Sequence, residues 1–428
     1  MVKTAVRALR AAAESPLRIA MLTTFYPPFN FGGDGIGIKR LATALVARGC
    51  EVTVIHDEDA YVVQSGAEPK PIEPVEGIKV VGLRSRMGLA SNLLTHQFGR
   101  PVVHGPRIKQ LMDEGDFDVT WFHNVSLVGG PGLLSYGRGV TVYEAHEHWL
   151  VCPTHVLWRY NRELCDEKHC LSCTISYRRP PQAWRYTDLL ESQLGHVDAF
   201  IAKSEFSRDK HRSFGFPRPM QVIPYFLPDE APANEAGGSP HERPYFLFVG
   251  RLEKIKGVQD ILPAFAGEDG ADLLIIGSGV YEAELRRQAA GLSRVKFLGR
   301  LPPEALSRYY AHARALIVPS VCYETFGIIL IESFRNGTPV IARDIGPFGE
   351  IIARGGGLLF SDDAQFREAL DRFGSDDAYR ARLGREARAA FDTNWREDVV
   401  MKAYFNLLHG SALAKGNARV LSALESLT

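Results

Sequence analysis

The feature that most constrains the fold is an alternation of short apolar stretches with helical patterns, which occurs twice along the chain. From Leu17 the sequence reads LRIAMLTTFYPP, FNFGGDGIG, IKRLATALVARG and EVTVIHD, in the order strand, glycine-rich loop, amphipathic helix and strand. Such an alternation indicates βαβ units and a parallel sheet. Further strands are expected at KVVGL, DVTWFH, GVTVYEA and AFIAKS. The first half of the chain is therefore predicted to be an α/β domain.

The same alternation restarts after LPDEAPANEAGGSPHERP, a stretch rich in Pro, Gly, Ala and acidic residues that has no periodicity. Strands are expected there at PYFLFVGRL, ADLLIIGSG, RVKFLGRL, ALIVPSV and PVIARD. A chain of 428 residues is also long enough for two cores. We expect two Rossmann-like α/β domains whose parallel sheets face one another across a cleft. The predicted boundaries are an N-terminal extension at 1–16, a first domain at 17–226 with a Cys-rich insertion at 150–186, a linker at 227–243, a second domain at 244–395, and C-terminal helices at 396–428 that cross back toward the first domain.

Composition indicates an ordinary enzyme-like chain. Hydrophobic residues make up 45% and charged residues 23%, and 50 basic residues balance 50 acidic ones, so no nucleic-acid-binding surface is indicated. We find no apolar run of about 18 residues, and MVKTAVRALRAAAESP lacks the continuous apolar stretch of a signal peptide. The expected location is the cytoplasm, where the six cysteines would be reduced thiols. The basic N-terminus adds the hypothesis of contact with the inner face of the membrane.

Two carboxylates bracket an apolar segment in YETFGIILIESFRNGTPV. A helix is expected over 326–336, with Glu324 just before it and Glu332 two turns inside, roughly 12 Å apart along the axis. The free N–H groups at the helix start would bind an anion. An anion site with a carboxylate at each end, each able to accept hydrogen bonds from ligand hydroxyls, fits a nucleotide diphosphate sugar. The alternative is that Glu324 caps the helix and Glu332 pairs with Arg335 or another cation.

A second segment, FVGRLEKIKG, places Arg251 at a strand end and Lys256 at the start of the following helix. Both would lie beside the cleft, because ligands of open α/β sheets bind outside the carboxyl ends of the strands. Two fixed cations could neutralise the charge that grows on a departing diphosphate, without a metal ion. The combination with the two glutamates favours the nucleotide-sugar interpretation.

Taken together, YPPFNFGG, RLATALVARGCEVTVI, HEHW, FVGRLEKIKG, IIGSG and ETFGIILIESFRNGTPVIA resemble family 4 of the retaining glycosyltransferases, which have the two-Rossmann-domain (GT-B) fold. The resemblance extends from Leu17 to about Trp395. It implies transfer of a hexose from a nucleotide diphosphate sugar, with UDP the commonest nucleotide, to a hydroxyl of a glycan or lipid-linked acceptor; a small-molecule natural product is the next candidate acceptor. No carboxylate is evident that could act as a covalent nucleophile, which favours a front-face mechanism.

The resemblance also implies roles for residues of the second domain. Glu324 would contact the hydroxyls of the donor sugar, and Glu332 would bind the ribose. The backbone amides at Phe326 and Gly327 would position the sugar and the phosphate.

Further roles follow for residues on both sides of the cleft. Arg251 and Lys256 would bind the diphosphate. The loop at Gly32 and Gly33 would approach the donor from the first domain, and His146 would contact the donor or align the acceptor. One more pair resembles a cleft-lining position, with a structural role as the alternative: His123 and Asn124.

Two patterns suggest other chemistry. HDEDAY contains the D-x-D of Asp57 and Asp59, which holds a divalent metal in other glycosyltransferases but is common by chance. FGGDGIGIKR, followed by acidic residues about 24 positions on, is similar to a dinucleotide-binding fingerprint and supports an NAD-dependent oxidoreductase as the alternative. The loop YPPFNF is too long for the usual tight turn of that fingerprint, so we rank this alternative second.

The insertion carries four of the six cysteines, in CPTHVLWRYNRELCDEKHCLSC with the spacing C-x12-C-x4-C-x2-C. The C-x2-C pair is typical of zinc knuckles, and four thiolates can close a tetrahedral structural site; the alternative is a set of buried free thiols. The candidate ligands are Cys152, Cys165, Cys170 and Cys173. Aromatic and basic residues nearby would suit a glycan or lipid-linked diphosphate acceptor, or form a plain amphipathic surface: Trp158, Arg159, Tyr160, Arg178, Arg179, Trp184 and Arg185.

Overall fold

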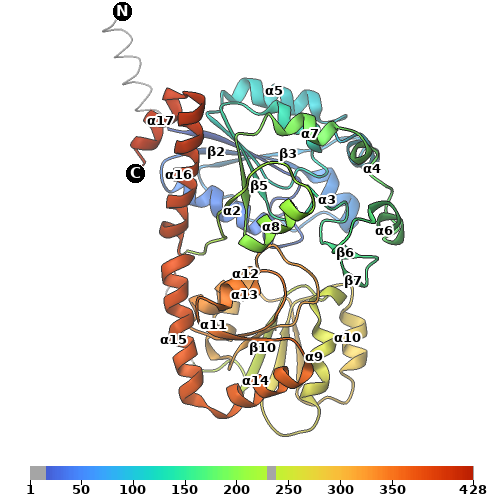
Figure 1. The fold of residues 1–428 in the computed structure, drawn as a ribbon, viewed down its shortest axis with the longest axis vertical. Coiled ribbons are helices and arrows are strands. Elements are labelled where there is room, and N and C mark those ends of the chain that lie inside the picture. The colour runs from blue at the N-terminus through green and yellow to red at the C-terminus, as the bar shows by residue number, and fades with distance from the viewer. Residues whose placement is uncertain (1–15, 229–237, 428) are drawn as a thin grey trace, which may run out of the picture.

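The computed structural model describes residues 16–228 and 238–427 (Figure 1). The expected N-terminal extension, apart from Pro16, and residues 229–237 of the expected linker lie outside the described residues. The chain forms two lobes, each built on a parallel sheet, so the predicted two-sheet α/β architecture is confirmed.

The first sheet has seven strands within the described residues, and all its pairs are parallel. Apolar clusters cover both of its faces, as expected for strands that read as continuous apolar runs. In sheet order the strands are β3 (Ile78–Leu83), β2 (Glu51–Asp57), β1 (Arg18–Thr23), β4 (Val119–Phe122), β5 (Val140–Ala145), β8 (Ala199–Ala202) and β9 (Gln221–Val222).

Helices connect these strands and surround the sheet (Figure 1). The first begins at the predicted glycine-rich loop, so its N-terminus lies at the carboxyl end of β1. The helices of this lobe are α2 (Gly33–Val46), α3 (Glu58–Ser65), α4 (Leu89–Phe98), α5 (Gly105–Gly115), α7 (Leu189–Leu194) and α8 (Glu205–Ser213). The insertion adds a small antiparallel hairpin and one short helix: β6 (Trp158–Arg159), β7 (Glu163–Leu164) and α6 (Cys170–Ser176).

The second sheet has six parallel strands among the described residues. Its outermost strand β15, like β9 in the first sheet, was not anticipated, because both are short strands at a sheet edge. In sheet order the strands are β12 (Val295–Gly299), β11 (Asp272–Ile276), β10 (Tyr245–Val249), β13 (Leu316–Val318), β14 (Val340–Arg343) and β15 (Gly357–Phe360). Its helices are α9 (Val258–Ile261), α10 (Glu282–Gln288), α11 (Pro303–His312), α12 (Ile328–Arg335), α13 (Phe348–Ile352), α14 (Asp363–Ser375) and α15 (Asp377–Asn394).

The chain passes between the lobes at two places that pair with each other. Leu227 and Arg396 form a parallel bridge, in which the Leu227 N–H donates to the Trp395 carbonyl at 3.0 Å. Beyond it, α16 (Glu397–Lys415) and α17 (Ala418–Glu425) run beside the first lobe (Figure 1). Residues of both helices belong to the same apolar cluster as β1 and α2. The last segment therefore completes the core of the first lobe.

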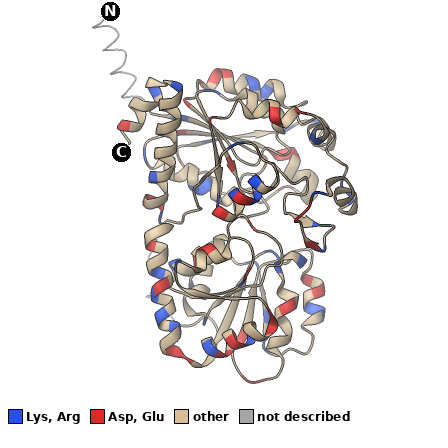
Figure 2. Ribbon diagram, viewed as in Figure 1, with Lys and Arg blue, Asp and Glu red and all other residues tan. Residues whose placement is uncertain are grey.

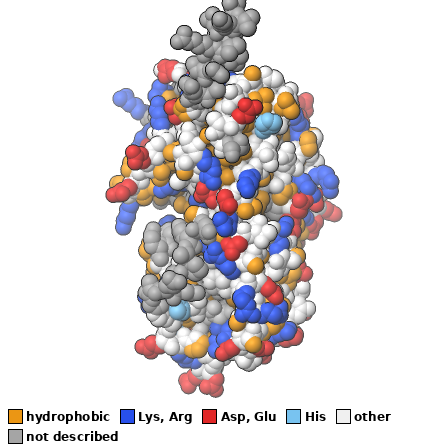
Figure 3. Space-filling model, turned by 90° about the vertical axis from the view of Figure 1, so that its left-hand side faces the viewer, with side chains coloured by type: hydrophobic (Ala, Val, Ile, Leu, Met, Phe, Trp, Pro, Cys, Tyr) orange, Lys and Arg blue, Asp and Glu red, His pale blue; other side chains and the backbone are white. Residues whose placement is uncertain are grey.

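Charge is spread over the whole molecule. Basic and acidic residues are interspersed along the outer helices of both lobes (Figure 2). On the face that carries α15 and α16, the two signs also mix where the lobes meet (Figure 3). Among the helices that the structure describes, none combines the length and the apolarity needed to span a bilayer.

Candidate functional site

Glu324 and Lys256 meet at the carboxyl edge of the second sheet. Lys256 lies in a 3-10 turn, η4 (Lys254–Lys256), after β10, and Glu324 follows β13. The Lys256 Nζ donates to Glu324 Oε1 at 2.8 Å, and the Ser320 hydroxyl donates to the same oxygen at 2.8 Å. Gly257 makes this approach possible, because its φ is +70° and a Cβ there would lie 2.0 Å from the Pro319 carbonyl oxygen.

This pair is ionised at neutral pH. Burial alone would raise the pKa of Glu324, but the Lys256 ammonium and the two hydrogen bonds outweigh it, so the pKa is lowered. The pKa of Lys256 is raised: burial lowers it, but the attraction of Glu324 and Cys322 and the hydrogen bond to Glu324 together exceed that effect. The site therefore offers a fixed carboxylate that can accept from hydroxyls and a fixed cation beside it.

Arg251 lies close to both lobes. It follows β10, its side chain is about half exposed, and its Nη1 lies 2.7 Å from Glu253 Oε1. Its positive charge lowers the pKa of Glu324 in the second lobe and opposes the rise in the pKa of Asp34 in the first lobe. A cation in this place can contact an anion held between the lobes.

Glu332 is held by partners from two elements. Its Oε1 lies 3.3 Å from Arg40 Nη2 of α2, and its Oε2 accepts from the Tyr310 hydroxyl at 3.1 Å. The side chain remains about one-fifth exposed. The cation that pairs with Glu332 therefore comes from the first lobe and was not named by the sequence. Glu324 makes no capping bond to α12, so the first part of the alternative is wrong, whereas its second part, a cation that pairs with Glu332, is confirmed by Arg40.

The helix between the two glutamates begins at Ile328, two residues later than predicted. Gly327 is the N-cap of this helix, and its φ of +109° is a left-handed conformation that prevents the helix from beginning earlier. Phe326, which precedes Gly327, is buried. Because Glu324 is not helical, the predicted rise of roughly 12 Å along a helix axis does not apply. The amides around Gly327 still lie at the N-terminus of an eight-residue helix.

The starts of α2 and α12 lie close to each other. Gly32 is the N-cap of α2, and a Cβ on Gly33 would lie 3.3 Å from Ile328 Cδ1 of α12. The absence of a side chain at Gly33, which is exposed, lets the start of α2 approach the start of α12 closely.

His146 has both ring nitrogens engaged inside the protein. Its Nε2 lies 2.9 Å from His123 Nδ1, and its Nδ1 lies 2.5 Å from the Tyr225 hydroxyl. Burial lowers its pKa well below the usual value, so the ring is neutral. Its carbonyl oxygen accepts from the Thr325 hydroxyl at 2.9 Å. In this structure His146 therefore contacts the loop of Glu324 through its backbone, and its ring has to exchange a partner before it can contact a ligand.

A buried ion pair supports the two histidines. Glu144, on β5, is paired with Lys203, which follows β8, and both side chains are almost fully buried. The Tyr404 hydroxyl of α16 donates to Glu144 at 2.8 Å and accepts from Lys203 at 2.8 Å. Burial would raise the pKa of Glu144, but Lys203 and the histidines lower it to about 2. Glu144 Oε2 is 3.8 Å from His123 Nδ1, so the carboxylate lies next to the histidine pair.

Asn124 and Asp34 lie near this group. Asn124 Oδ1 accepts from the Ser126 hydroxyl at 2.7 Å, and a side-chain hydrogen bond from Asn124 lowers the pKa of Asp34. Burial and Glu147 act more strongly in the opposite direction, so the pKa of Asp34 is raised. Asp34 is a cleft residue that the sequence did not single out, although it lies within the glycine-rich loop.

The D-x-D carboxylates serve as acceptors in the first lobe. Asp57 Oδ1 caps α3 by accepting from the Ala60 N–H at 3.0 Å. Asp59 Oδ2 accepts from the Ser85 hydroxyl at 2.6 Å and lies 3.2 Å from His104 Nε2. One ligand atom from each of Asp57, Asp59 and His104 lies within 4.8 Å of the others.

The aromatic and basic residues of the insertion do not form one exposed surface. Both tryptophans are buried, with Trp158 9% and Trp184 4% exposed. The Arg185 guanidinium stacks on Trp184 at 4.3 Å, whereas Arg178 and Arg179 are exposed. The prediction that aromatic rings of the insertion stack on an acceptor is therefore wrong for the two tryptophans, because both rings pack into the protein.

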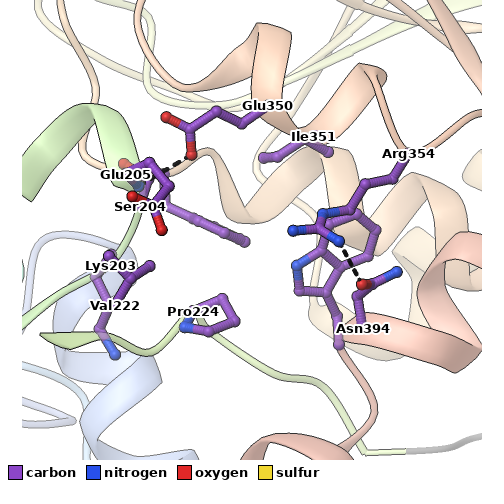
Figure 4. Close-up of a pocket in the computed structure, with 11 residues that line it drawn as sticks. Lys203, Ser204, Glu205, Val222, Pro224, Glu350, Ile351, Arg354 and Asn394 are labelled. Atoms are coloured by element: carbon purple, nitrogen blue, oxygen red, sulfur yellow. Dashed lines mark hydrogen bonds between the residues drawn. The ribbon is translucent and has the colours of Figure 1, made fainter.

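A separate cavity of about 210 Å³ lies where the chain crosses between the lobes (Figure 4). It is bordered by Lys203, Phe326 and Trp395, and Glu350 accepts from the Glu205 N–H at its edge at 3.0 Å. Of the residues predicted to bind the donor, its lining includes Phe326 and none of Arg251, Lys256, Glu324 and Glu332. The cavity therefore adjoins the candidate donor site at Phe326.

Solved structures share this architecture. Sucrose-phosphate synthase from Thermosynechococcus elongatus matches with a TM-score of 0.69 and 21% identity over 93% of this chain and 100% of that chain. HepE from Anabaena, in complex with UDP and glucose, matches with a TM-score of 0.63 and 16% identity over 92% and 100%. The predicted GT-B fold of glycosyltransferases is confirmed.

Sequence comparison gives the family. Residues 31–230 match the family described as Glycosyltransferase Family 4, and residues 230–390 match Glycosyl transferases group 1. A phosphatidyl-myo-inositol mannosyltransferase from Mycobacterium leprae is 33% identical over 91% of this chain and 96% of that protein. An O-antigen chain mannosyltransferase from Escherichia coli is 30% identical over 52% of this chain, and the match spans 63% of that protein. The chain belongs to glycosyltransferase family 4. Membership of this family favours glycosyl transfer over NAD-dependent oxidoreduction as the function of the chain.

Proposed function

We propose that this glycosyltransferase transfers a hexose from a nucleoside diphosphate sugar to a hydroxyl of a glycan or lipid-linked acceptor, with retention of configuration and without a catalytic metal ion. The observation that carries this proposal is the ion pair of Lys256 and Glu324, with Arg251 beside it. It provides a carboxylate for sugar hydroxyls and two cations for a diphosphate within one site.

The proposed binding mode divides the donor among these groups. Glu332 accepts from the ribose, Arg251 and Lys256 hold the diphosphate, and Glu324 holds the sugar hydroxyls. The backbone at Gly327 lies at the start of α12, where free N–H groups favour an anion. The start of α2 lies beside the start of α12, since a Cβ on Gly33 would lie 3.3 Å from Ile328 Cδ1, so the first lobe would contact a donor bound there.

The proposed reaction takes place on one face of the sugar. The bond between the anomeric carbon and the phosphate oxygen breaks, and the acceptor oxygen bonds to the same carbon from the same side. The departing phosphate oxygen takes the proton of the acceptor hydroxyl, so no protein base is required. Lys256 and Arg251 stabilise the charge that grows on the diphosphate. The network behind His146 fixes the neutral ring near the Glu324 loop.

UDP is the first candidate nucleotide, with GDP and ADP as the alternatives. HepE, which shares the fold, was solved with UDP, whereas two relatives of higher identity than HepE are named as mannosyltransferases, one of phosphatidyl-myo-inositol and one of O-antigen chains. Those names support a lipid-linked or glycan acceptor, with a small-molecule acceptor second. Peripheral membrane contact is part of the same hypothesis, and sedimentation with anionic liposomes tests it.

The decisive measurement is calorimetric titration with UDP, GDP, ADP and NAD in the presence of a chelator. We expect one nucleoside diphosphate to bind, with its affinity reduced in Glu332→Ala. Binding that requires a divalent metal would overturn the metal-independent mechanism, and binding of NAD alone would overturn the donor site. Proton NMR of the first product formed from the matching nucleotide sugar reports the anomeric configuration.

A further inference from the structure

The Cys-rich insertion contains little apolar core of its own. Between Cys152 and Ser176 its regular structure is a hairpin of two-residue strands and the seven-residue α6. The cluster beneath it has three fully buried members, Cys152, Leu157 and Phe214. Small modules with so little burial usually need a cross-link or a metal ion to hold one conformation.

The backbone of this segment also adopts costly conformations. Among the described residues, six non-glycine residues have positive φ, and all but Asp116 lie in the insertion. Left-handed conformations of such residues persist only where surrounding interactions enforce them. The five in the insertion are His155, Leu157, Tyr160, Asn161 and Arg178.

The fold places the four cysteines of the insertion in one region, although no three of their sulfurs lie within 4.8 Å of one another. Cys170 and Cys173 lie three residues apart on α6, so their side chains share one face of the helix. Cys165 directly follows β7 and packs on the cluster that contains Cys152. The Tyr160 N–H donates to Cys173 Sγ at 3.3 Å. All four are free thiols.

Each pair among the four sulfurs is close enough to interact electrostatically. Cys165 interacts with Cys152, Cys170 and Cys173, Cys170 interacts with Cys152 and Cys173, and Cys173 interacts with Cys152. Binding of a divalent cation by four thiols displaces their protons.

A cation beside the cluster has no carboxylate partner. Arg185 donates to the Trp149 carbonyl at 2.5 Å and to Gln182. Among the described residues, Arg185 forms no salt bridge within 4.0 Å, although Glu147 attracts it over a longer distance. Cys152 and Cys170 interact with its guanidinium more strongly than Glu147 does. A zinc ion with four thiolates is a dianion, which would compensate this charge.

We propose that the insertion binds one structural zinc ion through four thiolates, those of Cys152, Cys165, Cys170 and Cys173. In the described chain, three ligand atoms lie within 4.8 Å of one another only at two sites outside the insertion. The four sulfurs therefore have to move closer together to bind the ion. Zinc–sulfur bonds of about 2.3 Å require sulfurs less than about 4 Å apart. Four protein ligands leave no open position, so the ion has a structural role.

This zinc site would also position the donor loop. Asp166, next to Cys165, accepts from the Tyr323 hydroxyl at 3.0 Å and from Lys210 at 3.1 Å. Tyr323 directly precedes Glu324. A metal ion that fixes Cys165 therefore fixes one side of the loop that carries Glu324.

The test is the metal content of the full chain, purified without chelator, measured by inductively coupled plasma mass spectrometry. We expect about one zinc ion per chain, and loss of that zinc in the double variant Cys170→Ser/Cys173→Ser. The matched control is Cys50→Ser/Cys322→Ser, which removes two buried thiols outside the insertion and should retain zinc. Zinc absent from the wild type, or retained by the Cys170/Cys173 variant, would overturn the proposal.

A second readout does not depend on the folding of a variant. Wild-type protein exchanged with Co²⁺ should show the thiolate-to-cobalt absorption of a four-sulfur tetrahedral site. Intact mass under non-reducing conditions should show no disulfide; a disulfide between any two of the four cysteines would overturn the zinc site. UDP titration of the same samples tests the donor site separately. Failure of the zinc-site hypothesis can therefore be distinguished from failure of the donor-site hypothesis.

Discussion

Arg40 Nη2 of α2 lies 3.3 Å from Glu332 Oε1 of α12, and the two residues are separated by 292 positions in the sequence. This ion pair links the first lobe to the carboxylate that we assign to the ribose. Partly exposed pairs contribute about 0.2–1 kcal/mol. The pair is therefore weak enough for a ligand to replace, and a nucleotide that binds Glu332 competes with Arg40 for the same oxygen.

Arg40→Ala should strengthen UDP binding by up to about fivefold, the equivalent of about 1 kcal/mol, because Glu332 no longer has to exchange a partner. Calorimetric titration measures this. Lys39→Ala is the matched control, since it removes the same charge from the neighbouring position of α2 and should leave the affinity unchanged. Weaker binding in Arg40→Ala alone would show that Arg40 itself contacts the nucleotide.

Substitution of the two glutamates should separate turnover from binding. Glu324→Ala should lower kcat by about a hundredfold or more while UDP still binds, because the lost contact is to the sugar and the reacting centre. Glu332→Ala should instead weaken UDP binding by roughly tenfold or more, the loss of a hydrogen bond to a charged group. Steady-state kinetics and calorimetry of both variants check this. Equal, small effects on both quantities would contradict the assigned roles.

The local parts of this site could be predicted from the sequence, and the contacts between distant segments could not. Glu324, Lys256 and Arg251 follow strands that the apolar pattern reveals, and the carboxyl ends of parallel strands share one edge. The Arg40–Glu332 contact instead depends on how two lobes dock. The start of α12 was misplaced because nothing in FGIIL distinguishes a helical glycine from one with positive φ.

His146 and His123 were named from the sequence, but the residues that hold them were missed for a similar reason. Lys203 follows the strand AFIA and has the position of a surface residue, yet it is fully buried because α16 returns over the first sheet and brings Tyr404 to it. Tyr225 lies in a segment without periodicity. The one sequence signal was Gly37, where a Cβ would lie 2.6 Å from the Tyr225 ring, but a glycine alone does not name its neighbour.

Lys203→Met should destabilise the protein by about 3–5 kcal/mol, because it leaves Glu144 buried without its cation. The double variant Glu144→Gln/Lys203→Met removes both charges and should recover most of that loss. Urea denaturation of the wild type and both variants gives the three free energies of unfolding. If the double variant were as unstable as the single one, the loss would come from packing at Lys203 and not from an uncompensated charge.

Asp57→Asn should flatten the pH dependence of stability. Burial, aided by Asp59, raises the pKa of Asp57 to about 8, although the Ala60 N–H acts in the opposite direction. In the unfolded chain an aspartate has a pKa near 3.9. Between about pH 4 and pH 8 the folded state therefore binds the additional proton, and stability falls as the pH rises, by at most about 1.4 kcal/mol per pH unit.

Asparagine keeps an oxygen that can accept from the Ala60 N–H but has no proton to lose. The contribution of Asp57 to the slope should therefore disappear, and Asp57→Asn should be more stable than the wild type at pH 8 and similar to it near pH 4. Urea denaturation from pH 4 to pH 9 measures both. The control is Asp362→Asn, which changes an N-cap aspartate of α14 that is exposed. An unchanged slope in Asp57→Asn would mean that Asp57 is ionised in the folded protein, as a carboxylate bound to a cation with Asp59 and His104 would be.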